Sequence, residues 1–228
     1  MNAPKEMRKQ YRLNGKVLEL VEGDITAYDG RAIVVPANID FTYDGGLPGV
    51  LGAVVRAAGE GPFREAIKKG RQIAQKNGYV RFSGMDYNGL VRPFEGIVTS
   101  GGNLRGKSLI HLVSKDFRGH REPSNPGEVV IIGDGSYIDD VSIRESVKSG
   151  LKLAEKHNFE SVGFSAMGTG LYGVPLEVSV GNMVGPIRKY LQGQTPLQRV
   201  SLVLYGQRAY RLAERIADLY SSIPSNFR

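Results

Sequence analysis

Two glycine-rich segments of this chain have residue types that could bind an anion. The first, Gly45–Gly59, reads GGLPGVLGAVVRAAG and enters a helix from an apolar strand, and the second, Gly168–Gly173, reads GTGLYG and follows another apolar strand. Glycine adopts positive φ and lets backbone approach a ligand closely. Backbone N–H groups at such turns and at helix N-termini bind anions. Two such loops could hold a pyrophosphate from both sides, whereas either alone could be a tight turn without a ligand.

A third segment offers a competing phosphate motif. Gly101–Ser108 reads GGNLRGKS and matches the P-loop pattern, in which Lys107 would contact phosphates and Ser108 would hold Mg²⁺. A P-loop must lead into a helix, but residues 108–114 read SLIHLVS, which is typical of a short strand. We therefore expect strand, turn and strand here, with Lys107 on a surface turn. His111 is expected to point into the sheet or to hold a loop.

The composition excludes several classes of chemistry. The chain of 228 residues has no cysteine, which excludes disulfides, thiolate catalysis and cysteine-bound zinc. Three scattered histidines make no credible metal set, and no G-x-S-x-G elbow is present. We expect no cofactor and no metal. No apolar run approaches twenty residues and the first ten residues are polar, so we expect no membrane span, no signal peptide and a cytoplasmic location.

Positive charge is concentrated in two regions. The formal net charge is +7, and residues 1–16 carry five basic residues against one acidic residue. Residues 64–81 carry six basic residues against one acidic residue, and Lys68 and Arg71 lie on this predicted helix. Such a face could bind a nucleic-acid backbone. It is more often only a solvated face, and aromatic residues that would stack on bases are absent there.

The elements that must position the glycine loops alternate between strands and helices. This order predicts a single α/β sandwich with helices on both faces of the sheet, formed by residues 16–228 after a flexible basic arm at residues 1–15. Ser142 and Glu145 have the spacing of a capping box, while residues 78–95 show no clear period and 117–140 form a second insert. The expected strands are Val17–Val21, Ala32–Val35, Ile97–Ser100, Leu109–Ser114, Val129–Ile132, Ser161–Ala166 and Val200–Tyr205; the expected helices are Gly49–Ala58, Pro62–Asn77, Ser142–His157, Leu176–Leu191 and Arg208–Tyr220.

Seven segments in register resemble the macro domain family, the ADP-ribose-binding modules. They are VEGDIT (Val21–Thr26), AIVVPAN (Ala32–Asn38), RAAG (Arg56–Gly59), GIVTSGGNL (Gly96–Leu104), LIHLV (Leu109–Val113), SAMGTGLYGVPLE (Ser165–Glu177) and VLY (Val203–Tyr205). The resemblance spans about Val17 to Tyr220. It implies a three-layer α/β/α sandwich with a mixed, mostly parallel central sheet. It also implies that the ligand is ADP-ribose, free or linked to a protein.

The resemblance implies a role for each part of the site. Asp24 would accept a hydrogen bond from the adenine amino group, although it could equally be an N-cap residue. Tyr205 would stack on the adenine, although a core aromatic would also fit the end of a strand. Asn38 would reach the hydroxyls of the distal ribose beside Tyr172, or it could close a turn. The full implied binding set is Asp24, Ile25, Ala37, Asn38, Gly49, Val50, Leu51, Gly168, Thr169, Gly170, Leu171, Tyr172 and Tyr205.

Departures from the family pattern bear on catalysis. Members that hydrolyse ADP-ribosyl bonds often carry an acidic residue where this chain has Leu51, and Val35–Asn38 reads VPAN where the family commonly has NAAN. Leucine cannot deprotonate water, which leaves Asn38 as the one catalytic candidate. We expect binding of ADP-ribose. The open alternatives are hydrolysis of an ADP-ribosyl or related ester bond, and binding of RNA or poly-adenylate through the adenine pocket and the basic helix.

Overall fold

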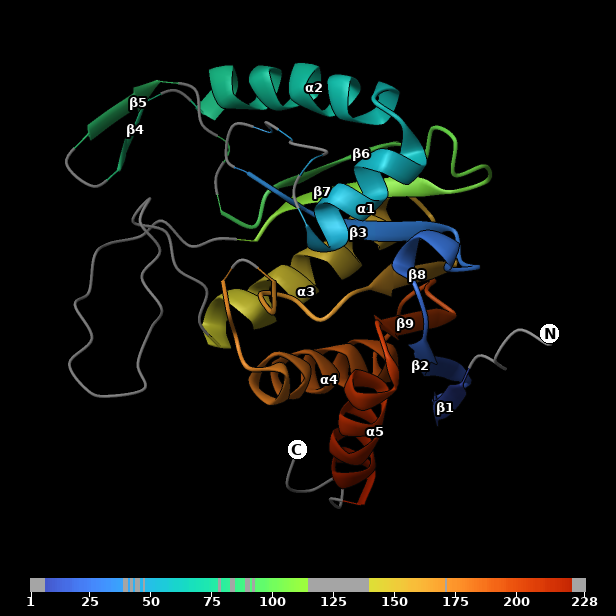
Figure 1. The fold of residues 1–228 in the computed structure, drawn as a ribbon. Coiled ribbons are helices and arrows are strands. Elements are labelled where there is room, and N and C mark those ends of the chain that lie inside the picture. Colours follow the sequence, from blue (N-terminus) through green and yellow to red (C-terminus); the bar gives the residue numbers. More distant parts are fainter. Residues whose placement is uncertain are drawn as a thin grey trace.

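The computed structural model describes residues 7–38, 41, 43, 46, 48–77, 79–82, 85–88, 91, 93–114, 140–170 and 172–222. Figure 1 shows their arrangement.

A seven-stranded sheet forms the centre of the fold. The five central strands run parallel to one another, and the two edge strands, β1 and β6, run antiparallel to their neighbours. The mixed, mostly parallel sheet is therefore confirmed. In spatial order the strands are β1 (Arg8–Leu13), β2 (Lys16–Glu22), β9 (Arg199–Leu204), β8 (Ser161–Phe164), β3 (Ala32–Ala37), β7 (Ser108–Val113) and β6 (Gly96–Ser100).

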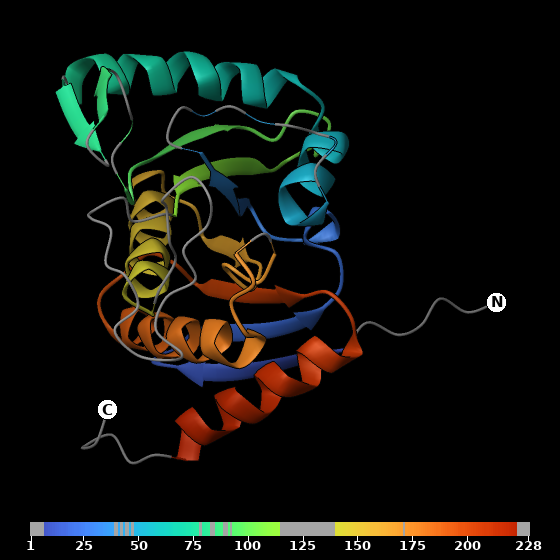
Figure 2. The same ribbon diagram turned by 60° about the vertical axis from the view of Figure 1, so that its left-hand side comes forward.

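Helices cover both faces of this sheet, and the three-layer prediction is confirmed. Figure 2 shows α3 and α4 on one side, and the short helix η1 with α1 on the other. The helix α2 lies along β6, and α5 lies near β1 and β2. The helices are η1 (Ile25–Ala27), α1 (Gly49–Ala58), α2 (Gly61–Asn77), α3 (Asp140–Lys156), α4 (Leu176–Gln192) and α5 (Gln207–Ser222).

Side-chain alternation along the strands divides the core between the two faces. Along β2, Leu18 and Leu20 join the larger cluster under α3, α4 and α5, whereas Val21 joins a smaller cluster with Ile25 and Val54. This is the period-two pattern of a sheet that is covered on both faces.

The parallel connections also fix where the helices begin. The helices η1, α1, α4 and α5 follow β2, β3, β8 and β9 along the chain, so each begins on the side of the sheet where its strand ends. Their N-termini therefore gather at one edge of the sheet, which is where open α/β sheets bind ligands.

The N-terminal arm was wrongly predicted for residues 8–13. These residues form β1, which pairs with β2 from Arg8↔Val21 to Leu13↔Lys16. The strand lacks an apolar run because both of its faces meet charged groups. Lys9 pairs with Asp218 on α5 at 2.8 Å, and Arg8 pairs with Asp29 at 2.9 Å on the other face. An edge strand rich in charge is a common device against edge-to-edge aggregation.

Two local predictions also differ from the structure. Ser142 does not cap a helix, because α3 already begins at Asp140 and the Ser142 side chain is buried inside its first turn. The region without a clear period contains a small antiparallel sheet of β4 (Tyr79–Phe82) and β5 (Met85–Asn88). The loop expected at 117–126 and the strand expected at 129–132 lie outside the described residues. Within the described part of the chain, no helix has the length and apolar character needed to cross a membrane.

Candidate functional site

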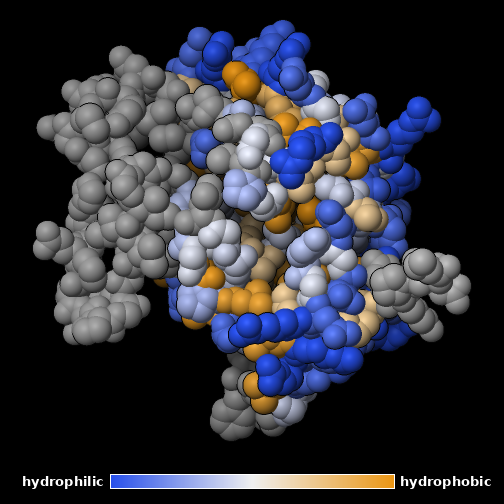
Figure 3. Space-filling view, in the orientation of Figure 1, coloured by the Kyte–Doolittle hydropathy of each residue, from blue (hydrophilic) through white to orange (hydrophobic). Residues whose placement is uncertain are grey.

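A cleft of about 440 Å³ lies at the carboxyl ends of β2, β8 and β9. Figure 3 shows this face of the molecule, where residues of intermediate and high hydropathy gather between hydrophilic residues above and below them. The lining combines strand ends with the first turns of helices. It consists of Gly23, Asp24, Ile25, Gly49, Val50, Ala53, Arg56, Ser165, Ala166, Thr169, Leu176, Val203, Leu204, Tyr205 and Ala209.

Two helix N-termini line the cleft without a side-chain cap. The N-cap residues of α1 and α4 are Pro48 and Pro175, and neither makes a side-chain hydrogen bond to its helix. The first-turn N–H groups of a helix have no intrahelical partner, and they carry the positive end of the helix dipole. Gly49 adopts a φ of +82° and has open space beside its Cα. This arrangement favours an anionic ligand at the start of α1.

Asp24 lies in the cleft and also caps a helix. Its Oδ1 accepts hydrogen bonds from the backbone N–H and from Oγ1 of Thr26, both at 2.8 Å. The N-cap interpretation is therefore correct. Both of these bonds end on Oδ1, so they leave Oδ2 with its acceptor capacity for a ligand. Ile25 is buried next to it and also lines the cleft.

Tyr205 is an exposed aromatic at the rim of the cleft. It follows the last residue of β9, and its relative exposure is 85%. The alternative that Tyr205 is a core aromatic is therefore wrong. An aromatic ring that lines a cleft while remaining open to solvent offers a stacking surface to a planar ligand.

The second glycine loop contributes one residue to the lining, Thr169. Its Oγ1 donates to the carbonyl of Ala166 at 3.0 Å, and Val174 N–H closes the loop on the carbonyl of Gly168 at 3.1 Å. Gly168 has a φ of +78°, which accounts for glycine at that turn. Gly168 and Gly170 do not belong to the lining.

The other predicted members lie outside the cleft lining or outside the described residues. Tyr172 is partly buried against the core on the α3–α5 side, and Leu51 packs against the cluster of α1 and β3. Ala37 is buried, and the half-buried Asn38 accepts a bond at its carbonyl from Phe41 N–H at 3.0 Å, as the turn interpretation expects. Leu171 lies outside the described residues.

Helical periodicity could have found two cleft residues that we did not predict. Ala53 and Arg56 lie four and seven positions after Gly49 on α1, which places them on the face that begins at the cleft. Arg56 brings a guanidinium group to this face. The remaining additions come from strand ends and helix starts, where sequence alone gives little signal. They are Gly23, Ser165, Ala166, Leu176, Val203, Leu204 and Ala209.

The P-loop interpretation is excluded by the structure. The strands β6 and β7 pair antiparallel up to Ser100↔Ser108, and residues 101–107 form the turn between them. Ser108 begins a strand rather than a helix, and its N–H donates to the carbonyl of Arg31 at 2.9 Å. Arg31 precedes β3, so this turn lies at the opposite edge of the sheet from the cleft. Among the described residues, no group of three or more His, Cys, Asp or Glu side chains could hold a metal ion.

Comparison with known proteins identifies the family. The family model described as "Macro domain" matches residues 34–183. An uncharacterized protein of Thermotoga maritima is 32% identical over 186 residues, which cover 82% of this chain but only 26% of that protein. A Klebsiella pneumoniae protein named O-acetyl-ADP-ribose deacetylase is 26% identical over 202 residues. The match covers 89% of this chain and 97% of that protein.

Solved structures show the same fold. The macrodomain of Oceanobacillus iheyensis, solved with ADP, matches with a TM-score of 0.72 at 23% identity, over 96% of this chain and 99% of that one. The macrodomain of Trypanosoma brucei, solved in complex with ADP-ribose, matches with a TM-score of 0.62 at 25% identity, over 87% of this chain and 68% of that one. The matched family, the relatives and the parallel sheet with its cleft agree, and this chain belongs to the macro domain family.

Proposed function

We propose that this protein binds ADP-ribose in the cleft, either free or as the terminal group on a modified protein. The observation that carries the proposal is the placement of two uncapped helix N-termini beside an exposed aromatic and a carboxylate in one cleft. A ligand that suits this set has an anionic centre and a planar end with hydrogen-bond donors. The T. brucei macrodomain solved with ADP-ribose and the O. iheyensis macrodomain solved with ADP support this ligand class.

The chemistry of the lining suggests an orientation for the ligand. The pyrophosphate would lie at Gly49 and Val50, with Thr169 opposite, because the N-terminus of α1 attracts negative charge. The adenine would lie between Tyr205 and Asp24, because a carboxylate accepts from the exocyclic amino group and the phenol ring stacks on the base. The distal ribose would then extend toward Asn38.

A calorimetric titration with ADP-ribose, AMP, ATP and a short oligoadenylate tests this proposal. ADP-ribose should bind more tightly than AMP, because AMP has neither the second phosphate nor the distal ribose. Equal affinity for AMP would contradict the proposed placement of the pyrophosphate. Lys107→Ala is the matched control, because Lys107 lies on a turn at the opposite edge of the sheet, and this variant should leave the titration unchanged.

The Klebsiella relative named O-acetyl-ADP-ribose deacetylase favours a second function, hydrolysis of an ester on ADP-ribose. Among the described residues, Asp24 is the one carboxylate in the cleft lining. It lies where we place the adenine rather than the ester. A water molecule would have to be held by Asn38 and by the phosphates of the substrate itself. We therefore propose binding as the primary function and slow hydrolysis as the secondary one. Release of acetate from O-acetyl-ADP-ribose is the test.

The nucleic-acid alternative would need two separate surfaces. Lys68 and Arg71 are exposed on α2, which packs against β6. Asp24 and Tyr205 follow β2 and β9, which lie in the other half of the sheet. Binding of oligoadenylate that falls steeply with salt and weakens on charge reversal at Lys68 and Arg71 would support this alternative.

A further inference from the structure

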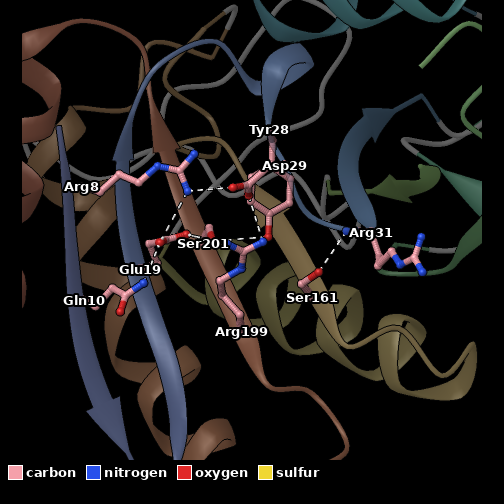
Figure 4. Close-up of polar contacts among 9 residues, drawn as sticks. All are labelled: Arg8, Gln10, Glu19, Tyr28, Asp29, Arg31, Ser161, Arg199 and Ser201. Carbon is pink, nitrogen blue, oxygen red and sulfur yellow. Dashed lines mark hydrogen bonds and ion pairs between the residues drawn. The ribbon is translucent and has the colours of Figure 1, made fainter. Parts of the chain in front are cut away.

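Four charged side chains form a closed ring of ion pairs on one face of the sheet (Figure 4). Arg8 Nη1 lies 2.9 Å from Asp29 Oδ2, and Arg199 Nη2 lies 2.9 Å from Asp29 Oδ1. Glu19 closes the ring, with 3.6 Å from its Oε1 to Arg8 Nη1 and 3.5 Å from its Oε2 to Arg199 Nη1. The charges alternate around the ring, so each carboxylate lies between two guanidinium groups.

Glu19 is buried but has hydrogen-bond donors on both oxygens. Its side chain is only 1% exposed. Gln10 Nε2 donates to its Oε1 at 3.0 Å, and Ser201 Oγ donates to its Oε2 at 2.9 Å. A buried carboxylate is tolerated only when it is paired and hydrogen-bonded in this way. The ring is therefore a fixed part of the fold, and it joins β1, β2 and β9.

Asp29 is the one member of the ring that does not come from the sheet. It belongs to the segment Asp24–Arg31, which leaves β2 at the cleft and crosses the sheet to the start of β3; we call it the crossing segment. Burial alone would raise the pKa of the Asp29 carboxyl, but the guanidinium groups of Arg199 and Arg8 outweigh burial and hold this pKa below its ordinary value. The ring therefore holds Asp29 as a charged anchor.

Tyr28 fixes the middle of the crossing segment on the same face. A Cβ atom added to Gly163 on β8 would lie 2.7 Å from the Tyr28 ring, so the ring lies directly on that glycine. The Arg199 guanidinium lies 5.6 Å from the centroid of the ring, and Ser201 Oγ lies 3.3 Å from the phenol oxygen. Tyr28 and Asp29 thus share Arg199 as a partner.

A short run of hydrogen bonds connects this anchor to the cleft. Tyr28 N–H donates to the carbonyl of Ile25 at 3.2 Å, and Ala27 N–H donates to the carbonyl of Asp24 at 3.0 Å. Thr26 N–H then donates to the Asp24 carboxylate. A displacement of Tyr28 would therefore be transmitted through η1 to the side chain that lines the cleft.

We propose that the ring of Arg8, Glu19, Asp29 and Arg199 is a positioning device that holds the crossing segment in place and thereby sets the adenine specificity of the cleft. The specificity half of this inference rests on the proposed function, whereas the positioning half does not. None of these four residues belongs to the cleft lining, so their proposed effect on the ligand is transmitted through the crossing segment to Asp24. The ring also gives the basic residues of β1 a function within the fold, because Arg8 is one of its members.

Hydrogen exchange of the ligand-free protein tests the positioning half. Asp29→Asn keeps the shape of the side chain but removes its charge, and Asp29 is exposed enough for the variant to fold. At neutral pH, the N–H groups of Ala27 and Tyr28 should exchange about three- to tenfold faster than in the wild type, as expected for loss of local ion pairs. Amides of β3 and β8 should be unchanged. Asp29→Glu, which retains the charge, should recover much of the protection.

Glu60→Gln is the matched control, because it also breaks an ion pair between a carboxylate and an arginine. Glu60 directly precedes α2 and pairs with Arg64 on that helix, away from the crossing segment. It should leave the exchange of Ala27 and Tyr28 unchanged. Unchanged exchange of these two amides in both Asp29→Asn and Arg8→Gln would overturn the positioning role, whatever the protein binds.

The specificity half is tested with an analogue that carries hypoxanthine in place of adenine. The exocyclic carbonyl oxygen that replaces the amino group cannot donate to Asp24, so the wild type should prefer ADP-ribose by roughly tenfold. In Asp29→Asn, this preference should be about three times smaller than in the wild type. A general loss of stability would weaken the binding of both ligands alike and leave the ratio of their affinities unchanged. If the amides of Ala27 and Tyr28 exchange faster in Asp29→Asn but this variant still prefers ADP-ribose as strongly as the wild type does, the specificity half alone would be overturned. A wild type that binds neither ligand would refute the proposed function, and the exchange result would still decide the positioning role.

Discussion

The Tyr43 hydroxyl lies 2.9 Å from Nδ1 of the buried His111 ring. On the other side of the ring, Nε2 lies 2.9 Å from Thr99 Oγ1, and that hydroxyl donates its single hydrogen to the carbonyl of Ser100 at 3.0 Å. Thr99 must therefore accept from His111, which places the proton on Nε2 and makes Nδ1 the acceptor for Tyr43. Because Tyr43 lies between β3 and α1, the expectation that His111 holds a loop is confirmed.

The stability of the protein should fall as the pH decreases from 6.5 toward 3 because of His111. Burial, with a smaller effect from Lys69, lowers the pKa of His111 from 6.5 to about 3. The folded protein keeps this ring neutral, whereas the unfolded chain takes up a proton below pH 6.5. This contribution to stability is complete above pH 6.5 and is lost as the pH falls toward 3. The free energy of unfolding should decrease by up to about 1.4 kcal/mol for each pH unit.

Urea unfolding at several pH values measures this slope. His111→Gln should flatten it. His157→Gln is the comparison variant: burial and Lys156 also lower the pKa of His157, but this side chain is exposed just after α3, so its substitution should flatten the slope less. An equal slope in the wild type and in His111→Gln would contradict the assignment.

The periodic elements of the fold could be predicted from the sequence. Apolar runs such as Ala32–Val35 and the stripe of Ile143, Val147 and Leu151 on α3 match the structure, because burial on one or both faces leaves a repeating pattern. The strand β1 could not be predicted in this way. Its stability depends on partners that are distant in sequence, such as Asp29 and Asp218, and a local pattern carries no information on them.

The candidate site was predictable in part, for a related reason. Asp24, Ile25, Gly49, Val50, Thr169 and Tyr205 all line the cleft. The first four lie at strand ends or helix starts that the sequence pattern locates, and parallel connections bring those positions to one edge. Tyr205 could not be distinguished from a core aromatic by sequence, because its exposure depends on the turn between β9 and α5.

Asp24→Ala should weaken the binding of ADP-ribose by roughly 1–3 kcal/mol, the usual effect of losing a charge-assisted hydrogen bond. It should also destabilise the fold by about 1 kcal/mol, because the cap on Thr26 is lost. Asp24→Asn separates the two roles, since it retains an oxygen for the cap but loses the charge. Calorimetry should show weaker binding in both variants, and thermal unfolding should show lower stability only in the alanine variant. An unchanged titration in both would remove Asp24 from the site.

Tyr205→Ala should weaken the binding of ADP-ribose by roughly 1–3 kcal/mol, the usual contribution of one aromatic stacked on a base. Tyr205→Phe retains the ring and should bind nearly as well as the wild type. Neither change should alter the melting temperature, because the side chain is almost fully exposed. If Tyr205→Ala and Tyr205→Phe bind ADP-ribose with the same affinity, the ring does not stack on the ligand.

Turnover on a protein ADP-ribosylated at glutamate or aspartate should be slow or undetectable. A positioned general base contributes about 10²- to 10⁴-fold to such a reaction. Leu51 stands where active members often carry an acidic residue, and it is partly buried against the cluster that contains Val54 and Ala58. Among the described residues, the cleft lining has no acidic side chain near the proposed pyrophosphate position, since we place Asp24 at the adenine end. The remaining contribution would be the positioning of the ribose that we propose for Asn38.

Two variants test this account of catalysis in opposite directions. Asn38→Ala should lower whatever turnover exists, because ribose positioning is then lost. Leu51→Asp should raise turnover if its carboxylate can reach the water, although it should also destabilise the fold, because a carboxylate replaces an apolar side chain packed in a cluster. Release of ADP-ribose under single-turnover conditions measures both. Fast wild-type turnover that Asn38→Ala leaves unchanged would show that the catalytic group lies elsewhere, and the acidic residues of the inserts at 78–95 and 117–140 would then be the first to substitute.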